Sequence, residues 1–456
     1  MTDLARLSAA EGARRLAAGS LTAETWAEAL LERSAARQPE IAAWITLDPA
    51  GALQAARAAD AAIRRDGPRA PLHGVPLGLK DCLDTAGLRT TGHSRRFLDQ
   101  VPDSDAALVS RLREVGAVIL GKQAMYELSY GGPSFDLPFP PARNPWNPER
   151  IPGGSSSGSA AAVADGQAPV SVGTDAGGSI RQPAAYCGVV GLKPTLGLVP
   201  RSGVLPLTFT LGEPGPLART VEDCALLLDA IAGTATAPQL SENLAGLRVG
   251  VLRTFFAGPA VRASEAVVDA VEGALSLFAT LGARLEDAVP PDPHLLDACG
   301  RVILLSEAFA NHEAQLRNDP AVYGRLARHR FALGAFLSAA DLLQAQRQRQ
   351  RLAAAMDALF DRYDVLACAG EVSGAPFFAD TVGDSFPFTQ QPSLRIPFNV
   401  TGHPALVLPC GFDAAGMPLS LQLVGRRGGE VRLLAAAHAL EARLGCRDAQ
   451  PPASVP

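Results

Sequence analysis

The chain reads GGSSSGS at residues 153–159, GTDAGGSIR at 173–181 and GLKP at 191–194. Glycines let successive backbone N–H groups converge on one point, because no Cβ atom obstructs them. Only three of the 41 lysine and arginine residues are lysines, namely Lys80, Lys122 and Lys193. Arginine keeps its proton, whereas a desolvated lysine can release it and act as a base. Serines combined with such a lysine point to acyl transfer through a covalent intermediate.

Composition indicates a large globular protein. Its 456 residues are 47% apolar and 19% charged, which is enough for an extensive core. A net charge of −5 does not favour nucleic acid or an anionic membrane as a partner. No apolar run of about 18 residues and no signal-peptide pattern is visible, so we expect no membrane span and a cytoplasmic location. The seven cysteines form no Cys-x-x-Cys pair, which predicts reduced thiols rather than a disulfide framework or a zinc site.

Stretches with helical periodicity alternate with short apolar runs typical of buried strands. The pattern predicts helices over 22–37, 51–65, 104–116 (capped by Ser104), 220–231, 261–280, 300–317, 334–360 and 430–443, and strands over 41–47, 75–80, 117–120, 170–172, 247–252, 405–409 and 419–424. Such alternation predicts an α/β fold with a well-covered sheet. Residues 233–242 are a candidate linker, but strands on both sides fit one sheet, so we expect a single domain. Residues 328–330 and 346–351 are rich in arginine and predict a solvated helix face.

Each of the three motif residues could have a purely structural role instead of a catalytic one. Ser179 follows Ala-Gly-Gly and precedes a predicted helix start, so an anion beside it would meet loop amides and a helix N-terminus. Ser155 lies in a glycine-rich loop that lacks the Gly-Lys-Ser/Thr ending of a phosphate loop. Lys80 closes an apolar run, where desolvation would lower its pKa, or it is a structural lysine paired with Asp81.

Taken together, these segments resemble the amidase signature family. The resemblance extends to GLKD at 78–81, GK at 121–122, RNPW at 143–146, PFN at 397–399, GHPA at 402–405 and PLSLQLVG at 418–425. It implies a large mixed, twisted β-sheet covered by helices on both faces. The expected organisation is a single amidase domain over 1–456, with its core at about 65–205 and a helical insertion at about 255–360. No metal or organic cofactor is implied.

The resemblance also implies a role for each motif residue. Ser179 would be the nucleophile, Ser155 a bridging serine after a cis peptide bond, and Lys80 the base. The implied oxyanion hole consists of the backbone N–H groups of Ala176, Gly177, Gly178 and Ser179, supported by Thr174, Asp175 and Arg181. The expected reaction hydrolyses a small linear carboxylic amide to a carboxylate and ammonia or an amine. Candidate pocket residues are Met125, Tyr126, Tyr130 and Ser156, together with segments near 205–212, 305–325 and 377–395.

Three alternative functions use the same residues. GSSSG at 154–158 matches the Gly-x-Ser-x-Gly elbow of α/β-hydrolase esterases, in which Ser156 would be the nucleophile and His403 or His438 the base. Such an elbow requires a strand directly before it, but residues 144–152 have the composition of a loop. The amidase-type component of glutamine-dependent tRNA amidotransferases shares the catalytic set, but usually carries Gly-Ser-Ser/Thr-Thr-Glu-Asn-Ser where this chain reads ELSYGGPSF at 127–135. That segment favours a stand-alone amidase, and a homodimer is a further hypothesis. A non-catalytic binding protein would not need all three catalytic positions.

Overall fold

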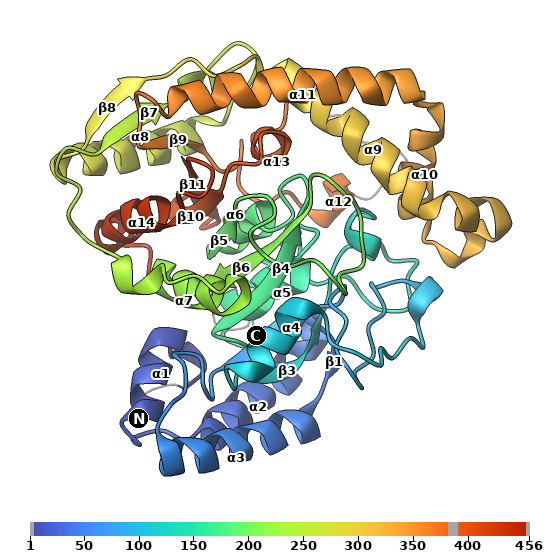
Figure 1. Cartoon of the computed structure of the whole chain (residues 1–456), viewed down its shortest axis with the longest axis vertical. Helices are drawn as coiled ribbons and strands as arrows, with labels where there is room; N and C mark the ends of the chain where they lie inside the picture. The colour runs from blue at the N-terminus through green and yellow to red at the C-terminus, as the bar shows by residue number, and fades with distance from the viewer. Residues whose placement is uncertain (1–3, 382–390, 453–456) are drawn as a thin grey trace.

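The computed structural model describes residues 4–381 and 391–452, in which eleven strands form one mixed sheet (Figure 1). The strand order is β1-β3-β2-β4-β6-β5-β10-β11-β9-β7-β8. The strands are β1 (Trp44–Leu47), β2 (Pro76–Lys80), β3 (Val118–Gln123), β4 (Val170–Asp175), β5 (Val190–Lys193), β6 (Glu213–Ala218), β7 (Arg248–Val251), β8 (Arg284–Asp287), β9 (Val365–Ala369), β10 (Ala405–Phe412) and β11 (Pro418–Gly425).

Helices surround this sheet. They are α1 (Ala9–Ala17), α2 (Ala23–Ile41), α3 (Pro49–Asp66), α4 (Ala107–Glu114), α5 (Ser157–Ala164), α6 (Arg181–Cys187), α7 (Val221–Ala232), α8 (Glu265–Thr280), α9 (Pro293–Asn318), α10 (Arg325–Ala332), α11 (Ala339–Leu359), α12 (Phe378–Thr381), α13 (Ile396–Val400) and α14 (Glu430–Leu444). In Figure 1, α1–α3 lie at the bottom of the molecule, and α9–α11 cross its top.

The sheet combines parallel and antiparallel pairs and is covered on both faces. β2 is parallel to β3 and β4, whereas β4, β6, β5, β10, β11 and β9 are joined by antiparallel pairs. Every residue of β2, β3, β6, β9 and β11 is buried, which requires helices over both faces. The predicted α/β class with a large mixed sheet is therefore confirmed. The candidate linker at 233–242 connects α7 to β7 and joins two parts of this one sheet.

Several predicted element boundaries were wrong: α9, for example, begins at Pro293 instead of residue 300. Two others have a local cause. Helix α2 continues through Pro39 to Ile41, so the strand predicted over 41–47 begins only at Trp44. Pro39 lacks the N–H that would bond to the carbonyl of Ala35, so the last turn of α2 forms with one intrahelical hydrogen bond fewer. Helix α4 begins after Ala106, and Ser104 does not cap it. The N–H of Ala106 donates to the carbonyl of Asp84 at 2.8 Å, so this part of the chain remains extended.

The predicted solvated arginine face was wrong for two residues. Arg330 of α10 donates to the carbonyl of Tyr130 at 2.8 Å. Arg349 of α11 donates to the carbonyls of Val400 and Thr210, both at 2.8 Å. Each guanidinium carries several donors on a long stem, so it reaches carbonyls in loops and, for Val400, at the end of helix α13.

The topology brings the motif segments to one place. β2 and β4 are parallel neighbours, with Leu77 opposite Val170 and Leu79 opposite Val172. Their carboxyl ends therefore lie side by side, and the chain enters α5 and α6 close to this edge, where α/β proteins commonly bind ligands. Across residues 4–381 and 391–452, none of the helices combines the length and apolarity needed to cross a bilayer.

Candidate active site

Lys80 is the last residue of β2, and its side chain is completely buried. Its Nζ atom donates to Ser155 Oγ at 2.8 Å and to Thr174 Oγ1 at 2.7 Å. Burial disfavours the charged ammonium and lowers the pKa of Lys80 to about 8. With two hydroxyl partners and a lowered pKa, this amine is suited to accept a proton near neutral pH.

The neighbouring Asp81 takes other partners. Its carboxylate accepts the N–H of Thr91 at 3.0 Å and lies 3.9 Å from Nζ of Lys122. Lys122 is buried as well and donates to Thr90 Oγ1 at 2.6 Å. Consecutive side chains of an extended segment point in opposite directions, which separates Asp81 from the amine of Lys80. The alternative of a Lys80–Asp81 ion pair therefore does not hold.

Ser155 is placed by a backbone that only glycine allows. The Gly154–Ser155 peptide bond is cis, as the resemblance implies. A Cβ atom on Gly154 would lie 2.2 Å from the ring of Tyr126, so the loop packs directly on that ring. The carbonyl of Ser155 accepts the N–H of Tyr126 at 3.0 Å, which fixes the loop to the segment after β3.

A buried carboxylate organises the loop that carries Ser179. Asp175, at the end of β4, accepts the N–H of Gly178 at 2.7 Å and that of Ile180 at 3.2 Å. Both of its oxygens also accept from the guanidinium of Arg181, at 3.0 Å each, and Asn399 donates to it at 2.9 Å. Burial alone would raise the pKa of Asp175, but the Arg181 charge beside it holds that pKa well below its ordinary value.

The turn between β4 and α6 leaves backbone donors available. Among the described residues, no acceptor receives the N–H groups of Ala176, Gly177 or Ser179, whereas that of Gly178 is bound by Asp175. Gly178 has a φ of 113°, and a Cβ atom there would lie 2.3 Å from Nε of Arg395. The position therefore requires glycine. The carbonyl of Ser179 accepts the N–H of Ser156 at 3.1 Å, so the two serine loops lie side by side.

A cavity of about 240 Å³ opens onto both serines. Ser155, Ser179, Thr174, Asp175 and Ala176 line one part of it. Residues 204–209, which we call the pocket wall, form another part, and Ser129, Arg201 and Gly212–Pro214 complete the lining. The predicted segment near 205–212 thus reaches the cavity.

The four single residues predicted for the substrate pocket lie elsewhere. Tyr126 packs on Gly154, and the ring of Tyr130 contacts that of Phe331 in a tilted arrangement. The hydroxyl of Ser156 donates to the carbonyl of Thr174, and Met125 is buried in the core. None of these four lines the cavity as far as the structure describes its walls, and part of the predicted segment 377–395 falls in residues 382–390, outside the described residues. Among the described residues, the segment near 205–212 is therefore the part of the predicted pocket that reaches the cavity.

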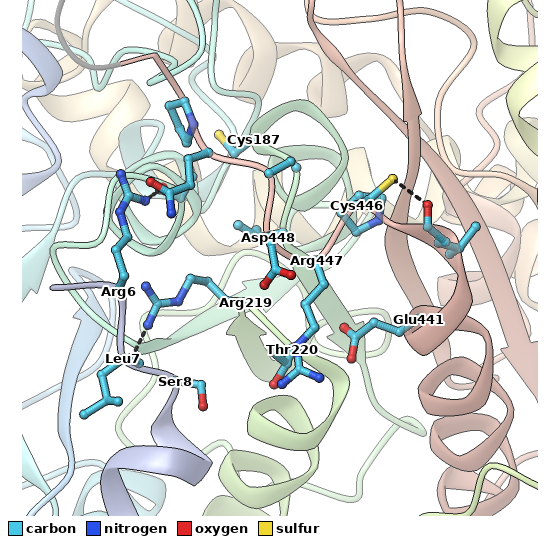
Figure 2. Close-up of a pocket in the computed structure, with 18 of the residues that line it drawn as sticks. Arg6, Leu7, Ser8, Cys187, Arg219, Thr220, Glu441, Cys446, Arg447 and Asp448 are labelled. Carbon is cyan, nitrogen blue, oxygen red and sulfur yellow. Dashed lines mark hydrogen bonds between the residues drawn. The ribbon is translucent and has the colours of Figure 1, made fainter. Parts of the chain in front are cut away.

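A second, larger cavity of about 420 Å³ lies between the N-terminal segment and the end of α14 (Figure 2). Figure 2 shows Arg6, Leu7 and Arg219 on one side of it, and Glu441 and Cys446 on the other. Arg219 donates to the carbonyl of Leu7, and Arg6 donates to that of Ala164 at 3.2 Å. These arginines therefore tie the N-terminal segment to the sheet. The described lining contains none of Lys80, Ser155 and Ser179, so this cavity lies apart from the candidate site.

The ion pair beneath the Ser179 loop has a measurable effect on stability. Replacing Asp175 by asparagine should lower the free energy of unfolding by about 3–5 kcal/mol, because the buried Arg181 loses its counter-charge. Urea denaturation measures the change. The matched control is Asp66→Asn, which breaks an exposed pair with Arg65 and should cost less than about 1 kcal/mol. Equal losses in the two variants would contradict the organising role of Asp175.

Within the described residues, no cluster of three or more His, Cys, Asp or Glu side chains is arranged to hold a metal ion. The site is thus built from one amine, hydroxyl groups and backbone amides. This donor set fits nucleophilic catalysis by serine, with a lysine as the base.

Comparison with known proteins gives concordant matches over nearly the whole chain. A family model described as Amidase matches residues 26–434. The A-type component of a glutamyl-tRNA(Gln) amidotransferase from Roseiflexus castenholzii is 39% identical over 471 positions covering 95% of each chain. The native peptide amidase from Stenotrophomonas maltophilia is 30% identical, with a TM-score of 0.82 over 98% of each chain. A chain from a vestigial protein complex, which reveals the evolutionary origins of an s-triazine catabolic enzyme, is 33% identical to this chain. Its TM-score is 0.88 over 96% of this chain and 98% of that one.

Proposed function

Because the chain belongs to the amidase family and is a hydrolase of amide C–N bonds, we propose that it cleaves a small carboxylic amide through a seryl acyl-enzyme on Ser179. The observation that carries this proposal is the fully buried amine of Lys80, hydrogen-bonded to Ser155 beside the Ser179 loop. We further propose that residues 1–456 form one amidase domain with its core at about 65–205 and a helical insertion at about 255–360.

The proposed reaction moves one proton along a relay. Neutral Lys80 accepts the proton of Ser155, and Ser155 accepts that of Ser179 as its Oγ attacks the amide carbonyl carbon. The tetrahedral intermediate then collapses, the C–N bond breaks, and the relay returns the proton to the departing nitrogen. Water attacks the resulting ester by the same route, releasing the carboxylate and restoring Ser179.

The backbone around Ser179 supplies the oxyanion hole in this proposal. We assign the donors to the N–H groups of Ala176, Gly177 and Ser179, which have no acceptor among the described residues. Gly178 was also expected to donate, but its N–H is bound by Asp175. Its role in the proposal is to shape the turn. Fixed donors of this kind need no reorganisation when negative charge develops on the carbonyl oxygen.

The pH dependence of the reaction tests the base. The pKa of Lys80 is lowered to about 8, and only the neutral amine accepts a proton. We therefore expect kcat/KM to rise about tenfold per pH unit below this value and to level off above it. Initial rates between pH 6 and 10, with folding checked at each pH, measure the profile. A profile that is flat or falls from pH 6 to 9 would exclude Lys80 as the base.

A second candidate function is favoured by two curated relatives at 39% and 38% identity. Both are named as the A-type component of a glutamyl-tRNA(Gln) amidotransferase, and such a component is expected to release ammonia from glutamine for a partner enzyme. If this chain shares that role, glutamine is hydrolysed, and added partner proteins support glutamine-dependent conversion of glutamyl-tRNA. Hydrolysis of simple amides without glutaminase activity would instead support the stand-alone amidase.

A further inference from the structure

We infer that Glu307 of α9 is a positioning residue that holds the pocket wall, residues 204–209, and that this wall selects an amide with an uncharged, apolar acyl group. The inference rests on the proposed function, because it concerns the acyl side of the same site. Two observations support it: the hydrogen bonds that hold the pocket wall to neighbouring elements, and the partners of the charged residues that line the cavity.

The pocket wall belongs to a long connection that needs external support. Residues 194–212 join β5 to β6 without a helix or strand of their own. Loops of this length inside a compact domain are uncommon and usually serve a binding site. The wall includes the apolar residues Val204, Leu205 and Leu207, which line the cavity and also pack against the core. At one end, the N–H of Leu205 donates to the carbonyl of Cys82 at 2.8 Å, directly after β2.

The other end of the wall is fastened to α9. The carboxylate of Glu307 accepts the N–H of Phe209 at 2.7 Å, the N–H of Thr210 at 3.0 Å and the hydroxyl of Thr210 at 2.6 Å. One turn further along, Asn311 donates to the carbonyl of Leu207 at 3.1 Å. Residues four apart lie on the same face of a helix, so both side chains hold the same loop. The Glu307 side chain is buried, which strengthens these charge-assisted bonds.

The charges that line the cavity are already engaged. Asp175 is paired with Arg181, and Glu213 accepts the N–H groups of Gly197 at 2.9 Å and Val199 at 2.8 Å. The guanidinium of Arg201 donates to the carbonyls of Phe209 at 2.9 Å and Gly212 at 3.0 Å. Among the described lining residues, no carboxylate is left for an ammonium group on the substrate. An acyl group carrying such a charge would lose its water without compensation, which is costly. The cavity volume of about 240 Å³ exceeds the roughly 150 Å³ of an apolar cavity that binds benzene, so an aryl or medium-length alkyl chain fits.

The experiment compares Glu307→Ala with wild type on acetamide, hexanamide and 3-phenylpropanamide. Loss of the three bonds to Phe209 and the adjoining Thr210, at the end of the wall, should raise KM for the two larger amides about 10- to 100-fold, while acetamide, which does not reach the wall, changes less than about threefold. Rates are divided by the concentration of active sites, titrated with a fluorophosphonate, so that a loss of folded enzyme does not enter. Glutamine should be a poor substrate for both proteins.

Two further variants separate positioning from stability. Glu307→Gln should retain most of the wild-type KM, because its carbonyl oxygen can accept both N–H groups while its NH₂ group donates to the Thr210 hydroxyl. Glu313→Ala removes an exposed carboxylate of the same helix, paired with Arg317, and should leave all three amides unchanged. An equal loss on large and small amides in Glu307→Ala, or efficient hydrolysis of glutamine by wild type, would overturn the inference.

The same proteins distinguish failure of the inference from failure of the proposed function. If wild type hydrolyses none of the amides, the proposed function fails. The role of Glu307 in positioning the pocket wall is then tested by the rates at which a methyl and an octyl fluorophosphonate label Ser179. Slower labelling by the octyl reagent alone in Glu307→Ala supports the wall. Unchanged relative rates, or no labelling of wild type, contradict it.

Discussion

Replacing Lys80 by methionine is expected to lower kcat/KM by about 10⁴-fold or more, because the proposed relay loses the base that accepts the proton of Ser155. Methionine has a similar length and no charge, so an apolar surrounding tolerates it. Steady-state ammonia release on hexanamide measures the loss, and circular dichroism confirms the fold. The hydroxyls of Ser155 and Thr174 remain, but neither can take up the proton of Ser179 near neutral pH.

The matched control is Lys122→Met. Lys122 is equally buried, and burial also lowers its pKa, but its partners are the Thr90 hydroxyl, the Leu83 carbonyl and Asp81. Its loss leaves Asp81 without a counter-charge and should lower the free energy of unfolding by about 3–5 kcal/mol. The folded fraction should keep kcat within about tenfold of wild type. A Lys80→Met enzyme that remains active, or two variants that are equally inactive when folded, would contradict the assignment of the base.

Replacing Ser179 by alanine is expected to lower kcat by about 10⁶-fold, the size of loss known for the nucleophile of subtilisin. Without Ser179 Oγ no acyl-enzyme forms, and only the backbone donors remain to stabilise the transition state. Because the methyl group of alanine fits wherever the serine does, the loss should appear in kcat without a change in thermal stability.

The variant Ser156→Ala tests the esterase alternative, in which Ser156 is the nucleophile, by the same measurement of kcat. The Ser156 hydroxyl donates to the carbonyl of Thr174 and accepts its N–H, both at 3.3 Å, and residues 151–156 form no strand before it. The Nδ1 atom of His403, one of the two proposed bases, lies 2.9 Å from the hydroxyl of Thr401. This variant should therefore keep kcat within about tenfold. An inactive Ser156→Ala enzyme beside an active Ser179→Ala enzyme would establish Ser156 as the nucleophile.

The sequence predicted the fold class and brought the correct segments together, but for unequal reasons. Apolar runs such as 75–80 mark buried strands by composition alone, because a strand covered on both faces needs no polar side. The prediction that Lys80, Ser155 and Thr174 lie together in one site came from the family resemblance. Local periodicity contains no information on which strand ends are neighbours, and here β2 and β4 are separated by β3 in the chain.

The pocket was predicted less well because its contacts are distant in the chain. Glu307 accepts a hydrogen bond from the N–H of Phe209, which lies 98 residues earlier in the chain. The sequence around either residue contains no pattern that predicts this contact. Arg349 likewise reads as part of a polar helix face, although its guanidinium bonds the carbonyl of Thr210. Gly178 could be predicted to shape a turn, but only the structure shows that Asp175 binds its N–H.

The central claim is that Ser179 is a nucleophile activated by Lys80, and locating a fluorophosphonate adduct tests it most directly. Trypsin cleavage after Arg150 and Arg181 yields one peptide that carries Ser155, Ser156 and Ser179, so fragment ions must assign the modified residue. We expect the adduct on Ser179 alone in wild type, and labelling slowed by about 10³-fold or more in Lys80→Met. An adduct on Ser156, or equal labelling rates in the two proteins, would contradict the claim.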